Sequence, residues 1–267
     1  MRFSRVSALV LRQFYLLRGS PARMLPLFAW VAIDIVLWGF ITRYLNTVAA
    51  PGVNFVPRLL GAVLLWDFLT RVMHGVSTAF FEDVWSRNFL NIFATPLSVE
   101  EYIGGLVLSS IATSAIGLTV MLILAAAAFG LSYMIYGAML LPFLLVLFLF
   151  GIALGVFGSA LVLRLGPAAE WLIWPVPAMV SPFAGVFYPI ATLPEWMQAV
   201  ARLMPASYVF EGMRAIVSGK PVSSGALATG AALAAAYVFL AGWFFLRVHR
   251  RAVRTGLLAR YSAESIS

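Results

Sequence analysis

The stretch that decides the fold runs from Tyr102 to Leu163 and reads YIGGLVLSSIATSAIGLTVMLILAAAAFGLSYMIYGAMLLPFLLVLFLFGIALGVFGSALVL. Its 62 residues include no charged side chain and no histidine. As one helix, at about 1.5 Å per residue, it would be roughly 93 Å long, which is about three times the thickness of a bilayer's hydrocarbon core. It must therefore fold back, and GLSYMIYG, Gly130–Gly137, marks the turn. We expect two membrane-spanning helices, over 102–129 and 138–163.

The whole chain is nearly as apolar as this stretch. Hydrophobic residues make up 63% of the sequence and charged residues only 10%. Strands of a membrane barrel would show short alternating runs in place of these long uniform ones, so the composition favours helices. We therefore predict an all-α polytopic membrane protein with six transmembrane helices, the other four over 24–44, 56–81, 168–188 and 223–246.

The N-terminal segment, 1–19, has the pattern of a helix that lies on the membrane surface. Its apolar residues recur at spacings of three and four, while Arg5 and Arg12 fall on another face. Gly19 ends the pattern. We expect an interfacial amphipathic helix whose apolar stripe consists of Phe3, Val6, Val10, Phe14 and Leu17.

Prolines interrupt the chain repeatedly after Gly166. A plain spanning helix would not tolerate so many, because each proline removes a backbone donor and clashes with the preceding turn. We expect a fifth span over 168–188, followed at 189–219 by short re-entrant helices that enter the membrane partway and return. The prolines concerned are Pro175, Pro177, Pro182, Pro189, Pro194 and Pro205.

Basic residues are distributed unevenly between the two sides that six spans define. Twelve arginines fall on the side of the termini, against four arginines and Lys220 on the other. The positive-inside rule then places both termini in the cytoplasm. We predict a multi-pass protein of the cytoplasmic (inner) membrane, with a basic cytoplasmic tail over 247–267 and a cytoplasmic loop over 82–101.

The cytoplasmic loop combines a helix start with a short amphipathic piece. Pro96 ends one helix, and Ser98 with Glu101 forms a capping box that begins the third span, where Glu100 adds favourable negative charge. The cap does not account for the apolar residues ahead of it, which suit a docking surface. The candidate docking residues of the loop are Arg87, Phe89, Leu90, Asn91, Phe93, Pro96, Ser98, Glu100 and Glu101.

Four ionisable residues fall inside predicted spans. Asp67, Arg71 and His74 are spaced by four and three, so they share one face of the second span, and Asp34 lies near the middle of the first. Either this face lines the route of a polar substrate or couples transport to protonation, or Arg71 neutralises an aspartate in a structural ion pair. The sequence leaves both interpretations open.

The motif GIALGVFG places three glycines, Gly151, Gly155 and Gly158, along the fourth span. Small residues at such spacings allow helices to approach closely. We expect helix packing here, either within the subunit or between two subunits.

Several kinds of chemistry are excluded by the residues that are missing. The phosphate-binding loop G-x-x-x-x-G-K-[ST] needs a lysine, and the only lysine, Lys220, is followed by Pro221. No nucleophile elbow of the form G-x-S-x-G occurs, and with no cysteine and two histidines no metal site is expected. We predict that the chain is not an enzyme, binds no cofactor of its own and has no nucleic-acid partner.

Three stretches carry a family resemblance: FATPLSVEEYIGG, Phe93–Gly105; FYPIATLPEWMQ, Phe187–Gln198; and LMPASYVFEGMR, Leu203–Arg214. They resemble the permease subunits of ABC-2 type ATP-binding cassette exporters, and the resemblance extends over essentially the whole chain. It implies a dimer of six-span subunits, as a homodimer or a heterodimer, that moves its substrate outward across the bilayer. Two copies of a separate cytoplasmic ATPase, which binds ATP and Mg, would dock on the loop at 82–101.

The same resemblance implies roles for the proline-rich region and leaves the substrate open among drugs, lipids and glycans. Its outer re-entrant helices would include Tyr188, Pro189, Pro194, Trp196, Pro205, Tyr208, Glu211 and Arg214. Two other classes remain as alternatives. One is a proton-coupled secondary transporter that uses Asp34, Asp67 and His74 as a relay, and the other is a membrane scaffold whose loop docks a different partner.

Overall fold

The computed structural model describes residues 2–49, 54–86 and 88–256, and no strand occurs in these ranges. Five of its helices are long and apolar enough to cross a membrane. They are α2 (Pro21–Val48), α3 (Gly61–Trp85) with the π-helical turn η1 (Val56–Leu60) before it, α5 (Val99–Phe129), α6 (Leu140–Leu165) and α10 (Ser224–Arg254). All five coincide with predicted spans. The all-helical membrane fold expected from the sequence is therefore confirmed.

The turn predicted at Gly130–Gly137 separates α5 from α6. Gly130 ends α5 with a left-handed backbone, at φ 65°, and the 3-10 segment η2 (Tyr133–Met139) then leads into α6. The hydroxyl of Tyr136 donates to the carbonyl oxygen of Pro57 at 2.6 Å, which fixes this turn to the start of the α3 helix.

The glycines of α6 bring this helix against α3, and both helices run in the same direction. A Cβ added at Gly151 would lie 2.8 Å from the carbonyl oxygen of Leu69, and one at Gly155 would lie 2.7 Å from that of Met73. Any larger side chain would therefore push the two backbones apart. The close packing predicted for GIALGVFG is confirmed within one subunit.

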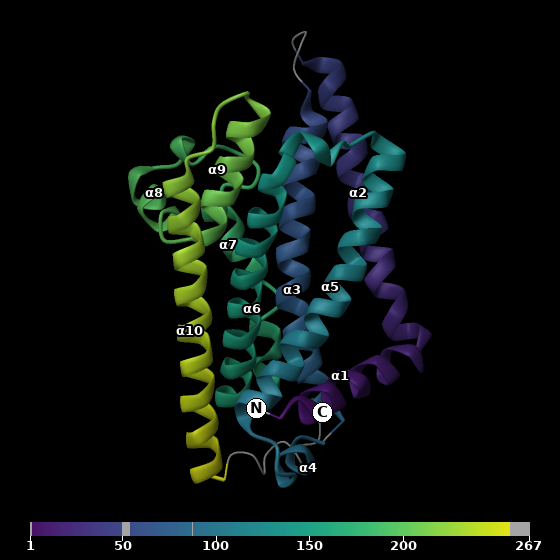
Figure 1. The fold of residues 1–267 in the computed structure, drawn as a ribbon, viewed down its shortest axis with the longest axis vertical. Helices are drawn as coiled ribbons and strands as arrows, with labels where there is room; N and C mark the ends of the chain where they lie inside the picture. The colour runs from purple at the N-terminus through teal and green to yellow at the C-terminus, as the bar shows by residue number, and fades with distance from the viewer. Residues whose placement is uncertain (1, 50–53, 87, 257–267) are drawn as a thin grey trace.

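Helix α10 packs along α6 in the same direction as well. The rings of Phe150 and Tyr237 lie 5.3 Å apart, and those of Phe157 and Phe244, seven residues further along each helix, also lie 5.3 Å apart. Because α6 ends at the end of the bundle opposite to the start of α10, the chain between them must return along the length of the bundle (Figure 1).

The first part of this returning segment, between α6 and α10, is not the single helix predicted over 168–188. The structure divides it into the 3-10 segment η3 (Pro167–Leu172) and the nine-residue helix α7 (Val176–Ala184). Neither is long enough to cross a bilayer, which takes about 20 helical residues. Pro175 lies between the two, and Pro175, Pro177 and Pro182 lack the N–H groups that a continuous helix would need.

Three short helical elements follow at the end of the bundle where α10 begins: η4 (Ile190–Thr192), α8 (Glu195–Ala201) and α9 (Pro205–Val217). Figure 1 shows α7, α8 and α9 together beside the first turns of α10. Pro205 occupies the first position of α9, where its missing N–H costs nothing.

The opposite end carries α1 (Phe3–Arg18) and α4 (Phe89–Ala94). Helix α1 lies across the ends of the long helices, and α4 lies beyond it (Figure 1). Helix α10 also ends here, eight residues later than predicted, so the first part of the expected basic tail is helical. Basic residues favour this extension because they interact well with the negative end of a helix.

Candidate functional site

The predicted cytoplasmic loop is built around the first turn of α5. Glu101 N–H donates to Ser98 Oγ at 3.2 Å, and Ser98 N–H donates to Glu101 Oε2 at 3.0 Å. This reciprocal pair is the capping box that the sequence predicted, and it satisfies backbone donors that the helix itself cannot. It sets the position of the chain as it leaves α4.

Glu101 also holds the N-terminal end of α1. Its Oε1 accepts the backbone N–H of Arg2 at 2.7 Å, and its Oε2 lies 3.2 Å from Arg5 Nη1. The side chain is only 4% exposed, so its oxygens are committed to contacts within the subunit. The prediction had placed Glu101 on a docking surface, whereas the structure gives it an internal role between α1 and α5.

A second ion pair holds the middle of α1. Arg12 Nη1 contacts Asp83 Oδ1 on the last turn of α3, and the hydroxyl of Tyr102 donates to Asp83 Oδ2 at 2.7 Å. Asp83 is buried, and two charge-assisted contacts stabilise its carboxylate there. Three helices, α1, α3 and α5, therefore meet at one carboxylate.

Close packing joins these polar contacts. A Cβ at Gly105 of α5 would lie 2.6 Å from Leu9 Cδ1, so α1 rests directly on this glycine. The other face of α1 exposes Phe3, Phe14 and Tyr15. Val6 of the predicted apolar stripe is buried within the subunit. The exposed rings would suit a membrane surface, and the interfacial position of α1 stays a prediction.

Helix α4 turns part of its apolar surface inward. Ile92 is buried, and the ring of Phe93 lies 5.1 Å from that of Tyr102 and 4.8 Å from that of His249 on α10. These two side chains are therefore at least partly used for internal packing. Of the predicted docking residues, the exposed ones are Asn91, Pro96, Ser98 and Glu100.

Three residues of the predicted docking set cannot be placed in this arrangement. Arg87 lies outside the described residues, and so do the side chains of Phe89 and Leu90. The direct contact of the loop with a partner therefore remains a prediction.

Six further residues help to hold the loop in place and were not among the predicted ones. They are Arg2, Arg5, Arg12, Asp83, Tyr102 and His249. One signal for them exists in the sequence: Arg5 and Arg12 are seven residues apart and so share a face of α1. That face needs acidic partners if it turns toward an apolar bundle.

The intramembrane residues form a cluster around Arg71. Arg71 Nε donates to Asp67 Oδ2 at 2.8 Å, which confirms the predicted pairing, and Asp34 of α2 lies within electrostatic reach of both charges. His74 faces a different neighbour, because its ring lies 5.0 Å from that of Trp174, between η3 and α7. The structure brings the two aspartates and Arg71 together and gives His74 an aromatic partner.

The predicted outer residues are tied together by hydrogen bonds. Glu211 Oε1 accepts the N–H of Ile190 at 2.8 Å and lies 2.9 Å from Arg214 Nη2. Tyr188 and Tyr208 donate their hydroxyls to the carbonyl oxygens of Pro182 and Arg202. Pro189 and Pro194 precede η4 and α8, Pro205 begins α9, and Trp196 is exposed. The short elements thus form one connected unit.

This arrangement agrees with a comparison against protein families. The family described as ABC-2 type transporter matches residues 5–217 of the chain. The chain belongs to this family. As an ABC-2 type transporter protein it is a multi-pass permease component of an ABC-type transporter, and the family is not itself catalytic. A comparison with curated proteins returned no match.

The match reaches elements at both ends of the helix bundle of this ABC-2 type protein. It includes most of α1, the loop around α4 and the short elements through α9, so the motifs that carried the resemblance all lie within it. Helix α10 lies beyond the matched range, but its packing along α6 makes it part of the same bundle.

Proposed function

We propose that this ABC-2 type protein is the permease subunit of an ATP-driven exporter, and that its loop at 82–101 receives the force of a separate ATPase. The transporter would hold two copies of the chain, identical or paired with a related chain, and two ATPase copies that bind ATP and Mg. Substrates would move outward, and the chemical class of substrate stays open among drugs, lipids and glycans.

The observation that carries this proposal is the number of helices fixed to the loop. Glu101 joins the start of α5 to α1, Asp83 joins α1 to the end of α3, and Phe93 of α4 packs on His249 of α10. A displacement of the loop would therefore pass to four helices at once. Rigid coupling of this kind is what conversion of ATPase closure into movement of a membrane domain requires.

We also propose that η3 and α7 together make a sixth crossing. Trp85 Nε1 at the end of α3 donates to Glu170 Oε2 of η3 at 2.8 Å, which places the start of this segment beside the loop. Its far end lies in the outer unit, where Phe187 stacks on Trp38 with ring centroids 5.2 Å apart. Six crossings would put both termini on the cytoplasmic side, in agreement with the arginine distribution.

The test uses the exposed residues of the loop and leaves the internal ones intact. Glu100→Lys combined with Asn91→Ala should reduce copurification of the partner ATPase and reduce substrate-stimulated ATP hydrolysis. Glu195→Lys is the matched control, because it reverses an exposed acidic residue at the opposite end of the bundle. It should leave both measurements unchanged.

Two results would overturn the proposal. If the loop variant retains ATPase association and stimulated hydrolysis, the loop is not the docking element. If the tagged chain brings down no ATPase, and transport in vesicles follows an imposed proton gradient, then a secondary transporter that uses the cluster around Asp34, Asp67 and His74 replaces the exporter.

A further inference from the structure

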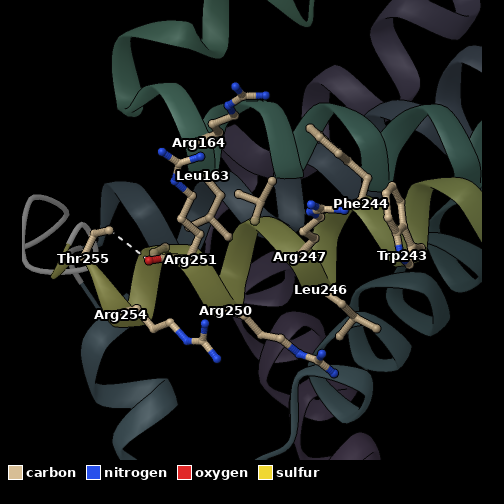
Figure 2. Close-up of a pocket in the computed structure, with 12 residues that line it drawn as sticks. Leu163, Arg164, Trp243, Phe244, Leu246, Arg247, Arg250, Arg251, Arg254 and Thr255 are labelled. Atoms are coloured by element: carbon tan, nitrogen blue, oxygen red, sulfur yellow. Dashed lines mark hydrogen bonds between the residues drawn. The ribbon is translucent and has the colours of Figure 1, made fainter.

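A cavity of about 920 Å³ opens between the last turn of α6 and the last turns of α10. Five arginines line it: Arg164 of α6 and Arg247, Arg250, Arg251 and Arg254 of α10. Figure 2 shows the side chain of Arg251 extended from α10 toward the last turn of α6, which carries Arg164. So many cations around one hollow repel each other unless negative charge occupies the space between them.

The protein does not supply that negative charge within its described residues. No acidic side chain lines the cavity, and none of the five arginines forms an ion pair with a described carboxylate. The two arginines of α1 that do have carboxylate partners show the contrast, since Arg5 and Arg12 reach Glu101 and Asp83. Among the described residues, no carboxylate balances the charge of the arginines that line the cavity, so the cavity suits an anionic ligand.

Part of the cavity lining is apolar. Leu163, Trp243 and Phe244 line it, and the guanidinium of Arg247 lies 5.2 Å from the centre of the Trp243 ring. Tryptophan is the side chain most typical of the boundary between lipid tails and headgroups. A ligand that fits both the arginines and the apolar part of the lining has an anionic head and a hydrocarbon tail.

The location of the cavity fits the same kind of ligand. It lies at the end of the bundle that carries α1, whose exposed rings suit the membrane surface (Figure 1). Arginine guanidinium groups bind phosphate oxygens through paired hydrogen bonds, and basic pockets between transmembrane helices at the cytoplasmic side suit lipid headgroups.

We propose that this cavity, between α6 and α10, is a binding site for the phosphate headgroup of an anionic phospholipid of the surrounding membrane. Arg164 and Arg251 hold the phosphate, the remaining arginines of α10 add positive potential, and the acyl chains follow Trp243 and Phe244 along α10. The site needs membrane insertion of the chain but no ATPase, so it stands apart from the proposed export function.

The experiment measures lipid binding by the purified protein in detergent. Phosphatidylglycerol and phosphatidylcholine with the same acyl chains are added, and thermal unfolding and retained lipid by native mass spectrometry are recorded. We expect phosphatidylglycerol to raise the unfolding temperature more than phosphatidylcholine and to be retained, with an effect that falls as salt is added. Equal effects of the two lipids on the unaltered protein would overturn the proposal.

Matched variants locate the site. Arg164→Gln with Arg251→Gln should weaken phosphatidylglycerol binding roughly ten-fold or more. Arg58→Gln with Arg202→Gln removes the same charge at the other end of the bundle and should bind as the unaltered protein does. Arg164→Lys with Arg251→Lys keeps the charge and should retain part of the binding. Unchanged binding by the glutamine variant would overturn the assignment.

A last control measurement tests whether the cavity binds a lipid or a soluble phosphate. Inorganic phosphate and glycerol phosphate are added alone at millimolar concentration. We expect neither to stabilise the protein as phosphatidylglycerol does, because neither covers the apolar part of the lining. An equal effect of either one would mean that the cavity binds a soluble anion, and the lipid would be the wrong occupant.

Discussion

The carboxylate of Glu101 accepts the backbone N–H of Arg2 at 2.7 Å, across 99 positions of the chain. The same side chain caps α5 through Ser98 and pairs with Arg5. One residue thus determines both where α5 begins and where α1 lies. The neighbouring Glu100 has none of these contacts in the described structure and is exposed, so the pair Glu100 and Glu101 offers a matched comparison.

Glu101→Ala should lower the thermal unfolding temperature, because it leaves the backbone N–H groups of Ser98 and Arg2 without their acceptor. Glu100→Ala should change it little. Glu101→Ala, but not Glu100→Ala, should also make α1 more sensitive to limited proteolysis. Equal unfolding temperatures for the two variants would show that the contacts of Glu101 contribute nothing measurable.

The buried carboxylate of Asp83 gives a second prediction. Tyr102→Phe removes one donor and should cost about 1 to 3 kcal/mol of unfolding free energy. Asp83→Ala leaves both Arg12 and Tyr102 without their acceptor and should cost about 3 kcal/mol or more. Denaturant unfolding of Arg12→Ala, of Asp83→Ala and of the double variant measures the coupling energy between Arg12 and Asp83. A coupling energy near zero would contradict the ion pair.

The contact between α3 and α6 gives a third prediction. Gly155→Ala should destabilise the protein by about 1 to 3 kcal/mol, since its Cβ would meet the backbone of Met73 at 2.7 Å. Gly242→Ala on α10 is the matched control, because open space surrounds that position. It should be neutral or stabilising by up to about 1 kcal/mol. Similar unfolding free energies for both variants would argue against tight packing at Gly155.

The pair of Asp67 and Arg71 gives a fourth prediction. It distinguishes a structural ion pair from a substrate or proton route through the intramembrane cluster. Each single neutralisation, Asp67→Asn or Arg71→Gln, should destabilise the protein, because it leaves the other charge without its partner. The double variant should be more stable than either. If the folded double variant transports normally, the pair is structural, whereas complete loss of transport would assign it to the substrate route.

Much of the fold follows from local signals in the sequence. The uncharged run from Tyr102 to Leu163 required two spans, and both are present as α5 and α6. Ser98 and Glu101 predicted a capping box because that motif depends on residues only three positions apart. The glycines of α6 predicted close packing, although the sequence could not say that α3 would be the partner.

The internal attachment of the loop could not be predicted in the same way. Ile92 and Phe93 are apolar, as the residues of a docking surface often are. Phe93 nevertheless packs inward, in part on His249, which lies more than 150 residues further along the chain. Arg12 and Asp83 are 71 positions apart, and no local pattern joins them. Such contacts depend on helix directions, which periodicity alone does not fix.

The prediction of a fifth span over 168–188 shows a different limit. Its apolar composition suggested one helix, while its prolines argued for interruption, and the structure follows the prolines with η3 and α7. Composition reports whether a segment can enter a membrane, but the backbone donors that proline removes decide whether it does so as a single helix.

The contact between Phe93 and His249 has a consequence for biosynthesis. A ribosome makes helix α10 well after the loop at 82–101, yet the final turns of α10 support that loop. A nascent or truncated chain without α10 would therefore display an unsupported loop with the ring of Phe93 uncovered on that side. The loop therefore takes its final supported form only after α10 has been synthesised and has packed against it.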